Sequence, residues 1–201
     1  MGSQALDDLR AEHRFMGKLL DLLQEQVRLI GEDKRPNEEL LLEIAQYFTS
    51  FPDLFHHPKE DLIFHRLAAL HPGAAGTIQA LEAEHEDTGR ELKRLVRAVV
   101  KLVLDPEADQ DRFLSAALAF METERRHMAW EEKSFFEVAE KRISPQEWEG
   151  IDRQLRGFIK PLCQREAQTR YERIERALQA WPCSHDDHGS AEGGTDNRAN
   201  L

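Results

Sequence analysis

Two histidine and glutamate pairs, each preceded along the chain by a lone histidine, are the residues best suited to chemistry. The copies are Glu12-His13 with His56-x-x-x-Glu60, and Glu84-His85 with His127-x-x-x-Glu131. The lone histidine precedes the paired one by 43 residues in the first copy and by 42 in the second. Residues four apart lie on one face of a helix, so each pair can bind one metal centre. Four imidazoles and two carboxylates suit iron or manganese better than zinc.

Composition places the chain among soluble single-domain proteins. It has 201 residues, 40% of them hydrophobic, which is enough for one sizeable core. No apolar run reaches membrane-spanning length and no signal peptide is visible, so we expect a cytoplasmic protein without membrane contact. The net charge of -11 and the lack of a basic stripe disfavour nucleic acid as a partner. Cys163 and Cys183 form no Cys-x-x-Cys motif and are expected to be free thiols.

The elements that must position these ligands are helices. Apolar residues recur at spacings of three and four over about 6–30, 41–67, 78–102 and 113–138. Pro52 or Pro58 should bend the second helix. At a rise of ~1.5 Å per residue, the ligands of each hairpin lie ~27 to 29 Å from its turn, so all of them fall in one layer. The spacing therefore predicts an all-α, up-down-up-down four-helix bundle with extra C-terminal helices.

The chain divides into three parts by composition. Residues 1–142 form the predicted bundle, 143–183 a helical extension, and 184–201 a polar, disordered tail. We expect helices at about 146–158 and 162–180 in the extension. Their apolar faces either cap the bundle or make a homodimer contact, and the sequence does not choose between these. His185 and His188 belong to the tail and are expected to be solvated.

These motifs resemble the hemerythrin-like, or HHE cation-binding, domain family in its bacterial single-domain form. The resemblance covers about residues 4–142 and includes His56-His57-Pro58-Lys59-Glu60-Asp61 and His127-Met128-Ala129-Trp130-Glu131-Glu132. It implies a four-helix bundle that holds two non-haem iron ions as its cofactor, with manganese or zinc less favoured. The ligands implied by the resemblance are His13, His56, Glu60, His85, His127 and Glu131. Glu60 and Glu131 would bridge the two metals.

One position departs from the oxygen-carrying members of this family. Those proteins have a second histidine four residues after the ligand on the third helix, where this chain has Gly89. The gap can admit water or a small substrate, and His57 is a candidate fifth imidazole. Reversible oxygen carriage is therefore disfavoured.

Several acidic residues next to the ligands are candidates for orienting them. The three candidates are Glu124, Asp61 and Glu132. Glu131 is preferred to Glu132 as a ligand because it shares the apolar stripe with His127. Glu12 and Glu84 lie one residue off the stripe, so a role facing solvent and a role supporting a ligand both stay open.

The expected function is binding of dioxygen, peroxide or nitric oxide in sensing, storage, detoxification or iron handling. This is metal and oxygen binding rather than dedicated enzyme activity. One alternative is a di-iron redox enzyme with peroxidase-like or catalase-like activity, or a protein that donates iron to damaged clusters. Another is a helical interaction protein with a structural metal such as zinc, which metal removal would unfold.

Overall fold

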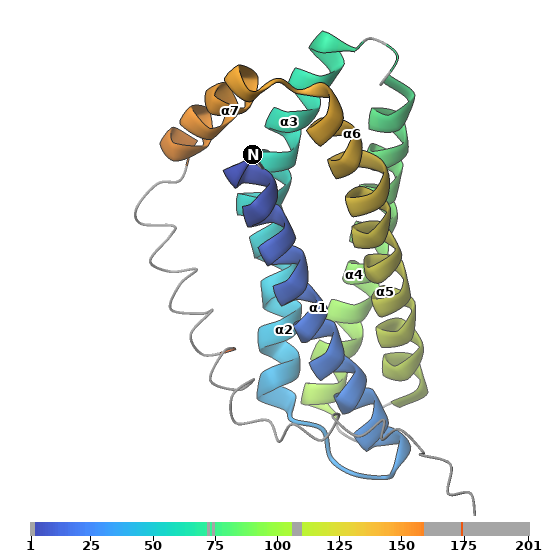
Figure 1. The fold of residues 1–201 in the computed structure, drawn as a ribbon. Helices are drawn as coiled ribbons and strands as arrows, with labels where there is room; N and C mark the ends of the chain where they lie inside the picture. The colour runs from blue at the N-terminus through green and yellow to red at the C-terminus, as the bar shows by residue number, and fades with distance from the viewer. Residues whose placement is uncertain (1–2, 72, 74, 106–109, 159–173, 175–201) are drawn as a thin grey trace, which may run out of the picture.

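The computed structural model of the chain is an antiparallel bundle of long helices with a shorter helix across one end (Figure 1). It describes residues 3–71, 73, 75–105, 110–158 and 174. The long elements are α1 (Gln4–Gly31), α2 (Glu38–Phe51), α3 (His57–Leu70), α4 (Ala75–Leu104) and α5 (Gln110–Trp130). The shorter ones are the π-helical turns η1 (Pro52–His56) and η3 (Glu131–Phe136), followed by α6 (Glu137–Arg142) and α7 (Pro145–Phe158).

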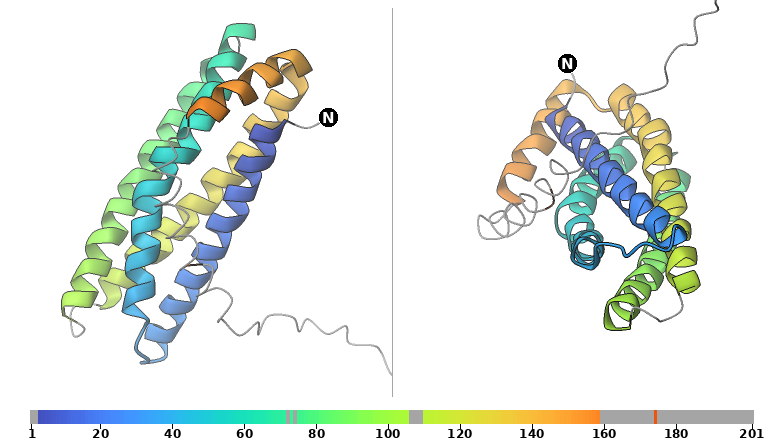
Figure 2. Two further views of the ribbon diagram at one scale, coloured as in Figure 1. Left: turned by 90° about the vertical axis from the view of Figure 1, so that its left-hand side faces the viewer. Right: turned by 90° about the horizontal axis from the view of Figure 1, so that it is seen from below.

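Four arms make up the bundle, and each arm runs antiparallel to the one before it. The first arm is α1, the second is α2, η1 and α3 in succession, the third is α4, and the fourth is α5, η3 and α6. Figure 2 shows these arms from the side and from below. All regular structure in the described residues is helical. The predicted all-α, up-down-up-down architecture is therefore confirmed.

Two arms contain a π-helical turn instead of continuous α-helix. The bend expected at Pro52 or Pro58 takes this form: η1 begins at Pro52, and the His57 N–H donates to the Pro52 carbonyl five residues back. The second turn begins at Glu131 and was not predicted. His56 ends the first turn, so each turn adjoins a predicted ligand. Single π-helical turns are frequent at functional sites.

The core consists of two apolar clusters separated by a polar layer. The larger cluster includes Leu19, Phe48 and Phe120. The smaller one lies nearer α7 and includes Leu9 and Phe135. On α1 the only buried polar position between the two clusters is occupied by a predicted ligand, since His13 lies between Leu9 and Met16. Apolar packing on both sides thus encloses the layer where the ligands meet.

Helix α7 covers the end of the bundle where α1 begins (Figure 1). Trp148 and Ile151 are buried in the smaller apolar cluster. Asp152 Oδ1 accepts a hydrogen bond of 3.2 Å from the Ala5 N–H, in the first turn of α1. Helix α7 therefore caps the bundle, and a homodimer contact of the extension stays a prediction. Of the second expected helix, at 162–180, the structure describes only Ile174, which is buried in the larger apolar cluster, and the tail at 184–201 lies outside the described residues.

The connection from α1 to α2 at the far end is fixed by side chains that satisfy backbone groups. Asn37 precedes α2, and its side chain accepts a hydrogen bond of 3.0 Å from the Leu40 N–H. Buried Gln26 accepts a 2.7 Å hydrogen bond from the Asn37 N–H and so ties α1 to the start of α2.

Within the described part of the chain, no helix has the length and apolar character needed to cross a membrane.

Candidate metal centre

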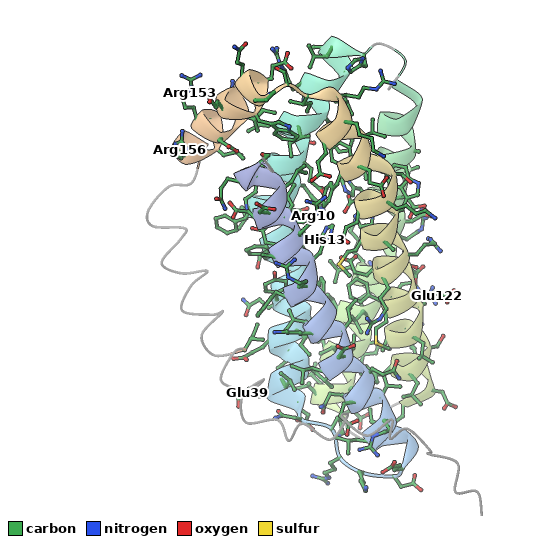
Figure 3. The ribbon with its side chains drawn as sticks, viewed as in Figure 1. Arg10, His13, Glu39, Glu122, Arg153 and Arg156 are labelled. Carbon is green, nitrogen blue, oxygen red and sulfur yellow. The ribbon has the colours of Figure 1, made fainter. Side chains whose placement is uncertain are left out.

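The six predicted ligands and His57 meet in the polar layer between the two apolar clusters. Figure 3 marks His13 on the stretch of α1 beside the fourth arm. One group of metal-binding side chains consists of His13, His56, Glu60 and Glu131. A second group consists of His57, His85 and His127. Within each group the potential ligand atoms all lie within 4.8 Å of one another.

The two carboxylates connect these groups. Glu131 Oε2 is 3.2 Å from His13 Nε2, while its Oε1 is 3.3 Å from His127 Nε2 and 3.4 Å from His85 Nε2. Glu60 behaves in the same way. Its Oε1 is 3.4 Å from His56 Nε2 and its Oε2 is 3.7 Å from His85 Nε2. Each carboxylate thus directs one oxygen to each histidine group, which is the arrangement a bridging ligand needs.

Carboxylates outside the centre hold the first histidine group. Glu12 Oε2 is 2.9 Å from His56 Nδ1, and the other Glu12 oxygen pairs with buried Lys59. Glu132 Oε1 is 3.1 Å from His13 Nδ1. In a metal site, contacts of this kind would keep the proton on Nδ1 and leave Nε2 free for the metal.

His56 is charged before any metal binds. Burial lowers its pKa, but the charge of Glu60 and the hydrogen bond to Glu12 outweigh burial and raise the pKa to about 10. Since a metal needs the neutral ring, binding at this side chain releases a proton.

Sequence reasoning missed two supporting residues. Lys59, which is 8% exposed, lies beside Glu60 in the motif and holds Glu12 in place. Asp53 lies four residues before His57, and its Oδ1 is 3.1 Å from His57 Nδ1. The spacing of four was visible in the sequence. The sequence did not reveal that the side chains of Lys59 and Asp53 lie beside the predicted ligands or their supporting carboxylate.

The remaining acidic candidates have different environments. Glu124 is buried one helical turn before His127, and burial, reinforced by the charge of Glu131, raises its pKa to about 7. Asp61 is exposed on α3. Glu124 therefore adds a carboxyl group that is half protonated near neutral pH, on the side of the layer facing the larger apolar cluster.

The two shared carboxylates have opposite pKa shifts. Burial, and then the charge of Glu131, raises the pKa of Glu60. Burial acts in the same direction on Glu131, but the charge of His127 and the close contact with His13 lower its pKa well below the usual range. Burial also lowers the pKa of His127 to about 4 and that of His57 to about 3. Both imidazoles are therefore neutral at pH 7 and have a lone pair for a metal.

The buried polar atoms of the layer fit a cation. Among the described residues, Glu60 Oε1 and Oε2, Glu131 Oε1 and Oε2, and His85 Nε2 are buried without a hydrogen-bond partner. Leaving such groups unsatisfied in an apolar interior is costly. Carboxylate and imidazole are the ligand types that iron and manganese accept. The chain therefore has a buried cluster of histidine and glutamate side chains suited to binding metal.

One side of the cluster is open to solvent. The side chains of His57 and His85 are 26% and 23% exposed, whereas that of His13 is 3% exposed. Gly89 lies one turn after His85, and a Cβ atom built on it would meet no other atom within 4 Å. A side chain at Gly89 would therefore extend into open space, one turn after His85 in the more exposed histidine group.

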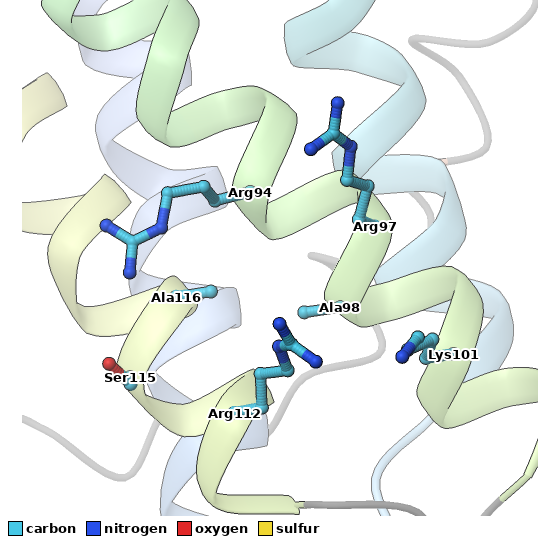
Figure 4. A pocket seen from close by; sticks show the side chains of 7 residues that line it. All are labelled: Arg94, Arg97, Ala98, Lys101, Arg112, Ser115 and Ala116. Atoms are coloured by element: carbon cyan, nitrogen blue, oxygen red, sulfur yellow. The ribbon is translucent and has the colours of Figure 1, made fainter.

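A basic pocket lies farther along α4 and α5, apart from the cluster (Figure 4). Its volume is about 270 Å³. Arg94, Arg97 and Lys101 of α4 surround it together with Arg112 of α5. The chain therefore has a local basic surface although its net charge is -11.

Comparisons with known proteins agree with this geometry. Residues 4–139 match the hemerythrin HHE cation binding domain. A search of curated proteins and a search of solved structures each gave no match. The family match covers about two thirds of the chain and both histidine and glutamate pairs. The chain therefore belongs to the hemerythrin HHE cation-binding domain family.

Proposed function

We propose that this chain is a di-iron protein that binds dioxygen, peroxide or nitric oxide. The observation that carries the proposal is that Glu60 and Glu131 each direct one oxygen to either histidine group. Two positions that share two carboxylates are what a pair of metal ions requires. A single structural zinc site needs only four ligands around one centre.

The residues divide between the two positions according to the histidine groups. His13 and His56 would hold one iron, and His85 and His127 the other, with Glu60 and Glu131 shared. His57 belongs to the group of His85 and His127 and would complete the second position. The two rings of His57 and His85 are 4.3 Å apart between centroids. If His57 binds, the position of His13 and His56 has fewer protein ligands and is the one with room for a small molecule.

The surrounding residues control access and protons. When bound, the iron ions would act as redox-active Lewis acids that attract small oxygen and nitrogen ligands. Phe136 stacks on the His13 ring at a centroid distance of 5.4 Å, and the apolar clusters on both sides keep bulk water out of the layer. Gly89 and the exposed edge of His85 provide the entrance for a small molecule. Glu124 holds a proton on its carboxyl group beside the layer.

A role in sensing, storage, detoxification or iron handling fits this arrangement better than a dedicated hydrolytic or transfer reaction. The candidate ligand atoms lie in a layer enclosed by apolar side chains, where only the edges of His57 and His85 among the candidate histidines are partly exposed. A layer of this kind suits a diatomic molecule or peroxide rather than a larger substrate.

Metal analysis with an optical spectrum tests the proposal. Protein produced in iron-supplemented medium should contain about two irons per chain, and azide should shift the bands of the oxidised form. His56→Ala and His127→Ala each remove one predicted ligand and should abolish these bands. His65→Ala is the matched control, because His65 is exposed on α3 and its Nδ1 lies 2.6 Å from the Asp61 carbonyl oxygen. One zinc per chain, or equal spectra in all variants, would contradict the proposal.

A further inference from the structure

The duplication in the sequence is also present in the fold. Arm one corresponds to arm three, since α1 and α4 run in the same direction, and arm two corresponds to arm four (Figure 1). The match of the motifs pairs Glu12 with Glu84 and His56 with His127. A contact made in one hairpin can therefore be compared with its counterpart in the other.

The first hairpin makes a contact that the second does not. Glu12 Oε2 on the first helix is 2.9 Å from His56 Nδ1 on the returning arm. In the second hairpin the two corresponding atoms are Glu84 Oε2 and His127 Nδ1. Both are buried, and neither has a hydrogen-bond partner among the described residues. An acceptor and a donor are thus left unsatisfied at equivalent places in the repeat.

The chemistry of His127 requires a partner at Nδ1. Its Nε2 faces the Glu131 carboxylate at 3.3 Å, so Nε2 is the atom directed at the metal position. A neutral imidazole that uses Nε2 as a ligand carries its proton on Nδ1. A buried N–H without an acceptor destabilises a protein, and ligand histidines almost always donate this proton to an oxygen.

We infer that Glu84 is the positioning residue for His127, and that it accepts the His127 Nδ1 proton when iron is bound. The inference rests on the proposed di-iron function and extends it to a residue that binds no metal itself. Glu84 would fix the ring of His127 as Glu12 fixes that of His56. Both histidine groups would then be supported by a carboxylate from the neighbouring helix of the same hairpin.

An ion pair with Arg126 is the rival role for Glu84. Arg126 Nε is 3.7 Å from Glu84 Oε2, and its side chain is 53% exposed. A long ion pair at the surface contributes little to stability. The repeat is also not exact elsewhere: Glu132 contacts His13, whereas its counterpart Asp61 makes no side-chain contact with a candidate histidine among the described residues. The two unsatisfied atoms, and not symmetry alone, therefore support the assignment.

Iron(II) affinity, measured by competition with a chelator, tests this assignment. Glu84→Ala should weaken binding by about tenfold or more, the range seen when the partner of a ligand histidine is removed. Glu84→Gln should recover most of that loss, because the amide oxygen still accepts a hydrogen bond. The cobalt(II)-loaded protein should show a changed visible spectrum in Glu84→Ala and a normal one in Glu84→Gln.

Two controls use residues of the same chain. Glu12→Ala removes the contact seen in the first hairpin and should weaken iron binding to a similar extent. Arg126→Ala removes the ion pair and leaves Glu84 in place, so iron affinity should not change. Melting of metal-free Glu84→Ala and Arg126→Ala should stay close to that of the wild type, because the Glu84 side chain is 27% exposed and that of Arg126 is 53% exposed.

The outcomes separate the two proposals. Unchanged iron affinity in Glu84→Ala, while Glu12→Ala loses affinity, would overturn the role of Glu84 alone. Equal losses in Glu84→Ala and Arg126→Ala would also overturn it, because the ion pair would then explain the effect. A wild-type protein that binds no iron would overturn the proposed function and this inference with it.

Discussion

Glu124→Gln should stabilise the metal-free protein, and only above about pH 5. The side chain is 7% exposed, and burial, with the charge of Glu131, raises its pKa from 4.5 to about 7. Since the folded protein holds this proton more tightly than the unfolded chain, stability falls as pH rises from the lower pKa to the higher one. Glutamine resembles the protonated acid and does not titrate, so the variant escapes this loss.

The size of the effect follows from the two pKa values. A tenfold difference in proton affinity between the folded and unfolded chains corresponds to about 1.4 kcal/mol, so the wild type should lose about 3 kcal/mol between pH 4 and pH 8 relative to the variant. At pH 4 the two proteins should unfold at nearly the same urea concentration. At pH 8 the variant should have the larger free energy of unfolding.

Urea unfolding of metal-free protein, followed by circular dichroism at several pH values, measures this difference. Glu122→Gln is the control, because Glu122 lies two residues away on the same helix and is exposed. A gain of the same size at pH 4 and pH 8, or the same pH dependence in Glu122→Gln, would rule out this explanation. Glu124 would then be neither desolvated nor affected by the charge of the cluster.

Three further predictions concern the cluster and its supports. His57→Ala should keep about two irons per chain but change the spectrum of the iron form and its azide affinity; an unchanged spectrum would show that His57 is no ligand. Phe135→Ala should lower the free energy of unfolding by about 3–5 kcal/mol, because this buried ring stacks on Phe64 at 3.8 Å, and a loss below about 1 kcal/mol would contradict that packing. Gly89→Ala should raise the free energy of unfolding by about 0.5–1 kcal/mol in the metal-free protein, since a Cβ meets no atom there and alanine favours a helix interior; a lower melting temperature would contradict the open space.

The bundle and its polar layer could be predicted because both depend on spacing. A histidine on an apolar stripe, such as His13 or His85, marks the buried face of its helix. Equal distances to each turn place the ligands at one level, since every residue adds the same rise. The structure brings all six predicted ligands together in this way.

The supporting contacts could not be predicted from periodicity. Glu12 and Glu132 lie one residue off the stripe, where a side chain can face either solvent or a neighbouring helix. The angle at which the helices cross decides whether such a side chain faces solvent or a neighbouring helix. In the structure, Glu12 and Glu132 both contact histidines that are predicted ligands. The π-helical turn at Glu131 contains no proline or glycine, so no residue in it predicts an interruption of the α-helix.

The position of His57 also depends on the backbone. Counting along the stripe places it at the edge of the core face. The π-helical turn at Pro52–His56 changes the angular position of the residues that follow, and the His57 ring lies beside that of His85. Whether His57 binds iron, and whether residues 1–142 form a unit separate from the extension, stay predictions.

A crystal structure of the iron-loaded protein, with diffraction data collected on either side of the iron absorption edge, would show the metal positions themselves. We expect two anomalous peaks in the polar layer, one beside His13 and His56 and the other beside His85 and His127. Glu60 and Glu131 should each contact both peaks. One peak, or two peaks that share no carboxylate, would contradict the di-iron centre.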